Sequence, residues 1–198
     1  MPDPAAAADH FAALGLPRRA ALSSGDVKTA FQEKSRSAHP DSGGDGEAFA
    51  RLTDAQRALS TAAGRLRHLL DLEHPGARGA AAGKAIAPDL MDAFAQIGGA
   101  LQAADAYLAE HAKASSQIAK AMLAGKGFAA QKALLQAGAA LQAAAANAES
   151  TLAHIDALRG GGAPEAEAAM LMAWGRLSLL EKWSAQLKAR NAQLAAAL

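Results

Sequence analysis

The apolar positions of this chain recur every three or four residues, which is the spacing of amphipathic helices. Short runs rich in glycine and proline separate the periodic stretches. The pattern predicts an all-α protein. In its N-terminal part we expect helices from about Ala5 to Leu14, from Ser24 to His39 and from Asp45 or Glu47 through Phe49, Leu52, Ala55 and Leu59, then a helical segment from Arg65 to Leu72.

The second and third of these helices should pair antiparallel. Ser23 or Ser24 can cap the second helix, and Val27 and Phe31 mark its apolar face. The apolar positions of the third helix should bury against Phe31 and Leu14. We expect the pair to form a two-helix finger.

A looser stretch of glycine, alanine and proline runs from His74 to Pro88, and we interpret it as a linker. Three long apolar patterns follow, separated by breaks at Gly125–Gly127 and Gly160–Pro164. Short connections favour antiparallel neighbours. We therefore predict an N-terminal domain at residues 5–73, a linker at 74–87, and a slender three-helix bundle at 88–198.

The polar tripeptide His39-Pro40-Asp41 ends the second predicted helix. A residue before proline is disfavoured in the α region, so the helix should end at His39, with Pro40 holding Asp41 outward. The tripeptide would then form a rigid polar turn at the tip of the finger. An ordinary helix stop followed by a turn is the alternative interpretation.

The composition restricts the classes of protein. The 198 residues suffice for one domain or two small ones, and 20 basic and 19 acidic residues give a net charge of +1, so we expect no nucleic-acid or membrane partner. The absence of cysteine excludes disulfides and thiolate metal sites, and we expect no cofactor. No apolar run reaches the roughly 20 residues of a membrane span, and the start Met1–Pro4 lacks signal-peptide features, so we expect a cytoplasmic location.

Four stretches together resemble a known family. They are residues 9–17 (DHFAALGLP), residues 22–41 ending in the tripeptide, residues 49–72 with the pair Arg65-Leu66, and residues 177–183 (LSLLEKW). The first two and the apolar positions of the third resemble the J domain of co-chaperones that stimulate DnaK-type ATPases. Arg65-Leu66 and the last stretch are similar to HscB, the J-protein group of iron-sulfur cluster assembly.

The resemblance implies a co-chaperone that is not itself an enzyme. His39, Pro40 and Asp41 would contact a DnaK-type (HscA-like) chaperone, and Lys28 and Arg36 on the second helix would supply positive charge for an acidic partner surface. The bundle would present a client, the scaffold protein on which iron-sulfur clusters are built. The residues matching that client-binding patch are Leu90, Met91, Phe94 and Leu179. Because Leu90 and Met91 are adjacent, they cannot both face one core, so one is expected at the surface.

The sequence departs from the family at several positions. Lys34 stands where a core leucine is usual, and it should lay its methylenes along the helix and send its charge to solvent. Ala38 replaces a tyrosine. In the client patch, Ala95, Gly98 and Gln102 stand in place of glutamates.

Other classes of function stay open at this point. The runner-up is a J protein whose client is unrelated to iron-sulfur clusters, and a further possibility is a helical adaptor or self-associating coiled coil. An enzymatic dyad of His39 and Asp41, or a metal site including His10, would need a pocket and an orienting third group that the sequence does not supply.

Overall fold

The computed structural model describes residues 8–38, 45–80 and 90–198, and the regular structure within these ranges is helical, with no strand. This confirms the all-α prediction. The chain divides into two compact units. The first unit comprises Met1–Lys84 and Ala148–Leu177, and the second comprises Ala85–Asn147 and Ser178–Leu198.

The short helix α1 (His10–Leu14) is held at both ends. Asp9 accepts hydrogen bonds from its first amides at 3.0 and 3.1 Å. At the other end, Gly15 adopts a φ of 69°, a conformation that glycine tolerates without strain. The Lys34 ammonium group donates a hydrogen bond to the carbonyl of Ala13 at 2.8 Å. Lys34 therefore places its charge at the C-terminal end of α1, where the helix dipole favours a cation, and not simply in solvent.

Two helices of the first unit begin with side-chain caps that the sequence supplies. Before α2 (Ser24–Ala38), Ser23 Oγ accepts from the Asp26 amide at 3.0 Å and the Asp26 carboxylate accepts from the Ser23 amide at 2.9 Å. Before α3 (Gly46–Leu59), the Asp45 carboxylate accepts from a first-turn amide at 2.9 Å. The predicted starts of both helices are confirmed.

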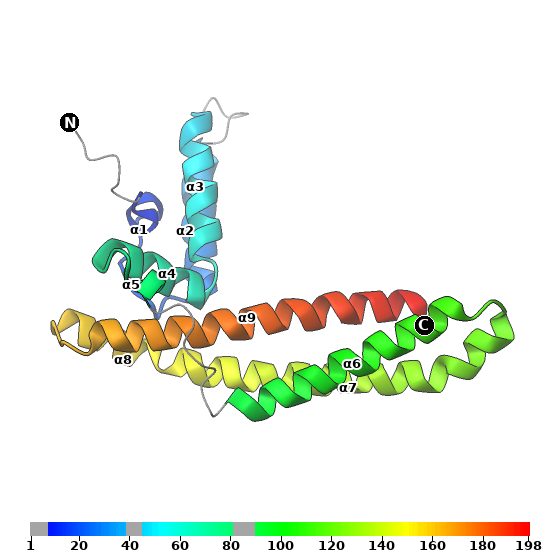
Figure 1. Ribbon diagram of the computed structural model, residues 1–198. Helices are drawn as coiled ribbons and strands as arrows, with labels where there is room; N and C mark the ends of the chain where they lie inside the picture. The colour runs from blue at the N-terminus through cyan, green and yellow to red at the C-terminus, as the bar shows by residue number, and fades with distance from the viewer. Residues whose placement is uncertain (1–7, 39–44, 81–89) are drawn as a thin grey trace. The chain divides into compact units, whose positions relative to one another are not determined.

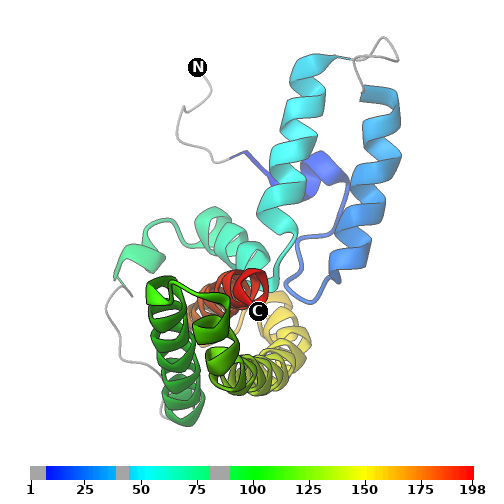
Figure 2. The same ribbon diagram turned by 90° about the vertical axis from the view of Figure 1, so that its right-hand side faces the viewer.

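Helices α2 and α3 lie side by side (Figures 1 and 2). The Phe31 and Phe49 rings meet between them, with centroids 6.3 Å apart. Both helices also contact α1, where Phe11 and Leu14 are buried. The expected helix pair, packed against the first helix, is therefore present. Further buried apolar residues of this group are Val27, Leu52, Ala55 and Leu59.

Helix α4 (Ala62–Glu73) buries Leu66, Leu69 and Leu70 completely. It is followed by the single turn α5 (Ala77–Ala80), which falls within the stretch that we expected to be a linker. Arg78 of this turn donates to Asp71 at 2.8 and 3.0 Å and lies 5.3 Å from the centroid of the Trp174 ring. Residues 77–80 of the stretch are thus helical, and Arg78 holds them through its side-chain contacts.

The first unit is completed by α8 (Leu152–Gly160) and the beginning of α9 (Ala166–Ala197). The predicted break at Gly160–Pro164 is confirmed, because α8 ends at Gly160 and α9 starts after the turn. Apolar side chains of this later segment are buried as well. They are Leu152, Ile155, Met170 and Leu177.

The second unit contains α6 (Met91–Lys113), most of α7 (Gln117–Ser150) and the later part of α9. Figure 2 shows these three helices nearly end-on. The Tyr107 hydroxyl donates to the carbonyl of Ala197 at 3.3 Å, and Asp105 lies 2.7 Å from Arg190 Nε. Helices α6 and α9 run in the same direction and α7 runs opposite to them. The interior combines large apolar side chains, such as Tyr107 and Trp183, with the alanines Ala100, Ala104, Ala130 and Ala137.

The predicted break at Gly125–Gly127 is wrong. Helix α6 ends at Lys113, α7 begins at Gln117, and α7 continues through both glycines. A Cβ at Gly127 would lie 2.8 Å from two ring atoms of Tyr107, so glycine here permits a close helix approach. The low helix propensity of glycine is a weak signal when tertiary packing requires a small residue. The glycine pair in α6, Gly98-Gly99, also leaves its helix unbroken.

Candidate functional site

The tripeptide His39-Pro40-Asp41 lies outside the described residues. Helix α2 ends at Ala38, directly before it, and α3 begins after Asp45, so the tripeptide belongs to the connection between two packed helices.

Two basic candidates lie on α2. Lys28, Gln32 and Arg36 follow one another at steps of four residues, which aligns them along one side of the helix, and all three are exposed. Neither Lys28 nor Arg36 forms an ion pair with any residue that the structure describes. Both side chains are exposed, and salt would weaken an attraction between them and an acidic surface.

Arg65, the first residue of the pair that we compared with HscB, is buried with 4% of its surface exposed. Its Nε donates to the carbonyl of Ala20 at 2.9 Å, and Nη1 donates to the carbonyl of Leu59 at 3.2 Å. The side chain therefore ties α4 to the segment before α2 and to the end of α3. It fixes the base of the helix pair.

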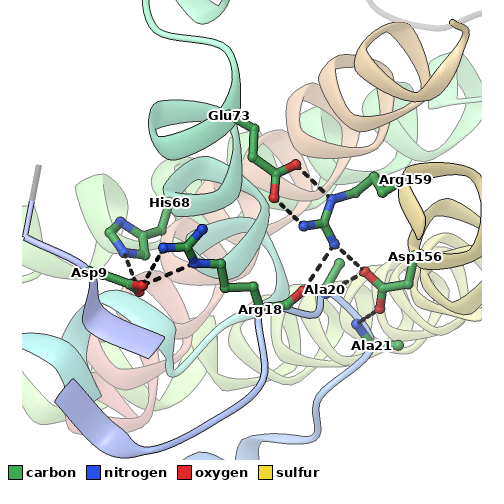
Figure 3. Close-up of polar contacts among 8 residues, drawn as sticks. All are labelled: Asp9, Arg18, Ala20, Ala21, His68, Glu73, Asp156 and Arg159. Atoms are coloured by element: carbon green, nitrogen blue, oxygen red, sulfur yellow. Dashed lines mark hydrogen bonds and ion pairs between the residues drawn. The ribbon is translucent and has the colours of Figure 1, made fainter. Parts of the chain in front are cut away.

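A second polar group joins the start of the chain to α4 (Figure 3). Arg18 donates to Asp9 Oδ2 from Nε and Nη2, at 3.0 and 2.8 Å. The His10 amide donates to His68 Nε2 at 2.9 Å, so this nitrogen acts as an acceptor and the buried imidazole is neutral. His68 Nε2 also lies 3.9 Å from Asp9 Oδ1.

The pKa values in this group move with its surroundings. Burial lowers the pKa of His68, and the neighbouring His10 and Arg67 lower it further, against the opposing influence of Asp9 and Asp71. For Asp9, burial alone would raise the pKa, but the hydrogen bond and charge of Arg18 and the two amide bonds lower it overall. The two shifts favour a neutral His68 and an ionised Asp9.

The third polar group contains residues that the sequence did not single out (Figure 3). The Asp156 carboxylate accepts from the amides of Ala20 and Ala21, both at 2.9 Å. Arg159 donates to Asp156 Oδ1 at 2.8 Å and to Glu73 through two nitrogens. These carboxylates raise the pKa of Arg159, although burial alone would lower it.

The same arginine also donates to the carbonyl of Arg18 at 3.1 Å. Asp156 and Arg159 therefore lock α8 onto the segment that leads into α2. Two opposite charges three residues apart in an alanine-rich helix were a visible signal, but the sequence does not reveal their distant partners.

An open hollow of about 260 Å³ lies beside His68 and is lined by His10, Arg67, Asp71 and Arg78 among others. Asp71 and Arg78 are already paired with each other. Within the described ranges, no group of three histidine, aspartate or glutamate side chains is arranged to hold a metal ion. None of the helices described is both long and apolar enough to cross a membrane.

The client-patch candidates of the second unit divide by exposure. Leu90 is buried, whereas Met91 and Phe94 expose 50% and 45% of their surfaces, so the expectation that one of the adjacent residues lies at the surface is confirmed. Phe94 rests on Trp183, with ring centroids 5.6 Å apart. Leu179 on α9 is partly exposed.

Comparison with protein-family models, curated proteins and solved structures found no match.

The candidate residues that the structure describes fall into two groups, one basic and one apolar. The structure brings Lys28 and Arg36 together on α2, and Met91 and Phe94 together on the first turn of α6. Leu90, in contrast, is buried in the interior.

Proposed function

We propose that this chain is a J-domain co-chaperone of the HscB kind. In this proposal residues 5–73 bind and stimulate a DnaK-type, HscA-like ATPase through His39, Pro40, Asp41 and the basic side chains of α2. Residues 88–198 bind the client, an iron-sulfur cluster scaffold protein. The chain itself performs no catalysis.

The observation that carries the proposal is the packed pair of α2 and α3, with the tripeptide in the connection between them. Two packed helices fix the two ends of this connection, which lowers the ordering cost of presenting polar groups to a partner. Buried Arg65 braces the base of the pair from α4, and exposed Lys28 and Arg36 lie on the same helix that leads into the tripeptide.

The client part of the proposal is supported by Met91 and Phe94. Half-exposed large apolar residues next to each other on a helix, with an aromatic ring beneath, are typical of a protein-binding surface. Leu90 contributes to the interior and not to the contact surface. Because Ala95, Gly98 and Gln102 carry no charge, recognition here would depend on apolar contact and not on acidic residues.

The first test measures steady-state ATP hydrolysis by an HscA-like chaperone in the presence of this protein. Wild-type protein should accelerate hydrolysis, and His39→Gln should lose most of the stimulation. His154→Gln is the matched control, because His154 is an exposed histidine of α8 away from the tripeptide. Equal rates with wild type and His39→Gln would overturn the ATPase proposal.

The second test titrates the cluster scaffold protein into this protein by calorimetry. The double variant M91A/F94A should weaken binding at least about tenfold, since two surface apolar side chains are lost. Met172→Ala is the control, because Met172 is 77% exposed on α9. Binding that is absent, or equal in the double variant, would favour a client unrelated to iron-sulfur chemistry, which the missing glutamates also favour.

A further inference from the structure

Helix α7 has apolar residues on two opposite sides. Its inner side is buried in the second unit through Gly127, Ala130, Leu134, Ala137 and Leu141. Large apolar side chains also project outward, which is unusual for a helix at a protein surface. They are Ile118, Met122, Phe128 and Leu135, which expose 77%, 82%, 61% and 60% of their surfaces.

These four side chains lie on one side of the helix, which we call the outer face of α7. At about 100° per residue, their positions fall within an arc of roughly 140° centred opposite to the buried side. Small residues, Ala121, Gly125 and Ala129, lie between them on the same arc. Large apolar and small residues therefore alternate along the outer face, with Gly125 between Met122 and Phe128.

Charge is sparse on the outer face. Lys132 lies on it, whereas Lys126 is paired with Glu110 of α6 at 2.6 Å and Lys120 points to another side of the helix. Helix α7 has no acidic residue before Glu149. An anionic membrane or an acidic partner would call for a row of basic residues beside the apolar ones, and the single lysine does not provide it.

The exposed area is close to what a contact between two copies requires. Side chains of this size present on the order of 150–200 Å² each, so the four at their observed exposures present about 500 Å². This is near the upper end of the apolar patches that monomeric proteins leave open to water. Two copies would together bury about 1,000 Å² from these side chains alone, which is the lower threshold for a specific interface, and the neighbouring small residues of the face would add to it.

We infer that the outer face of α7 is a homodimer interface in which α7 of one copy packs antiparallel against α7 of a second copy. Under a two-fold axis, one register places Ile118 against Leu135 of the partner at both ends. The same register places Phe128 against Gly125, so a large ring meets the lowest point of the opposing helix. Lys132 then lies across from Ala121 and not from another cation.

The dimer is separate from the proposed co-chaperone surfaces. Met91 and Phe94 are on α6, and Lys28 and Arg36 are on α2, so neither surface uses the outer face of α7. Loss of dimerisation and loss of ATPase stimulation are therefore distinguishable results.

Sedimentation of the full chain from low to high micromolar concentration tests the inference. Wild-type protein should shift from monomer to dimer, and Met122→Lys should weaken dimerisation about a hundredfold, because the substitution is present twice in the interface. Met172→Lys changes a methionine of similar exposure outside the outer face and should dimerise like wild type. Circular dichroism should show unchanged helix content in both variants.

A wild-type protein that stays monomeric throughout overturns the inference, and so does an equal effect of Met122→Lys and Met172→Lys. Binding of a monomeric protein to anionic lipid vesicles in the same sedimentation run would assign the outer face to a membrane surface instead.

The orientation has its own test. The chain lacks cysteine, so Ile118→Cys introduces a unique site for a nitroxide spin label. In the antiparallel dimer the two labels are separated along the helices by the rise from position 118 to position 135, about 25 Å. A distance well below this, measured by double electron–electron resonance, would indicate a parallel pair and overturn the proposed register.

Discussion

The two units solve the problem of holding helices together in different ways. In the first unit, polar side chains enter the interior and several of the joints contain hydrogen bonds, through Arg65, His68 and Asp156 with Arg159. In the second unit the buried side chains described are apolar, and the ion pairs described are at the surface. Hydrogen bonds fix which segments meet, whereas small side chains fix how closely helices approach.

The two units also differ in exposed apolar surface. Large apolar residues of the first unit, such as Phe11, Leu66 and Met170, are fully buried. The second unit also buries large side chains, including Tyr107 and Trp183, but more of its large apolar residues are exposed. The second unit therefore offers more apolar surface to partners.

The largest expected effect comes from removing the buried arginine of the first unit. Arg65→Met should lower the free energy of unfolding by about 3 kcal/mol, because the buried carbonyls of Ala20 and Leu59 lose charged donors. Arg67→Met is the control on the same helix, and because Arg67 is exposed its effect should stay within about 0.5 kcal/mol. Urea unfolding measures both, and equal losses would contradict the role of Arg65.

A comparison of aspartates tests whether polar joints matter more in the first unit. Asp156→Asn should cost about 2 kcal/mol, because the Ala20 and Ala21 amides and Arg159 lose a shared carboxylate whose side chain is 13% exposed. Asp105→Asn removes an ion pair of the second unit with a carboxylate that is 53% exposed, and it should cost less than about 0.5 kcal/mol. Thermal unfolding of both variants measures the two losses of stability. Similar losses would contradict the idea that polar contacts matter more in the first unit than in the second.

Close packing in the second unit is tested at glycine. In Gly127→Ala the new Cβ would lie 2.5 Å from Leu198 Cδ2 and 2.8 Å from the Tyr107 ring. The crowding should outweigh the gain in helix propensity and destabilise the protein by about 1 kcal/mol. Gly138→Ala, in open space on the same helix, should be neutral or stabilise by up to about 1 kcal/mol. A stabilised Gly127→Ala variant would show that the helices do not need this approach.

The smallest expected effect is a pH dependence from the first unit. Because the pKa of His68 is lowered in the folded protein, the unfolded chain binds more protons, and stability should fall as the pH drops below about 6.5. The lowered pKa of Asp9 adds a further loss at more acidic pH. In His68→Gln the melting temperature should depend less on pH in the range where His68 titrates. In His154→Gln, which changes an exposed histidine, the pH dependence of the melting temperature should stay as in the wild type.

The features that could be predicted from the sequence depend on interactions between residues close together in the chain. Helices α2 and α3 were predictable because Ser23, Asp26 and Asp45 act within a few residues of themselves. Helix geometry alone predicted that one of Leu90 and Met91 would be exposed, and the structure shows that it is Met91.

Other features depend on partners far along the chain. The break assigned to Gly125–Gly127 was wrong because Tyr107, on another helix, requires a small residue there. The bonds from Ala20 and Ala21 to Asp156 connect residues with no local relationship, and no periodic pattern reports them. Likewise, we expected the positive charge of Lys34 in solvent. The sequence does not show that the Lys34 ammonium group donates to the Ala13 carbonyl, because Ala13 belongs to another helix, α1.

The division of α9 affects how the protein can be dissected. One continuous helix supplies Ala166–Leu177 to the first unit and its remaining residues to the second. A single cut in the chain therefore cannot release either unit whole. A fragment that ends after α5 would lose the Asp156 carboxylate that receives the Ala20 and Ala21 amides, and a fragment that starts at α6 would carry the buried residues Ile155 and Met170 without the rest of their core. Experiments on fragments that test the proposed activities therefore need the N-terminal helices and the segment Ala148–Leu177 supplied together.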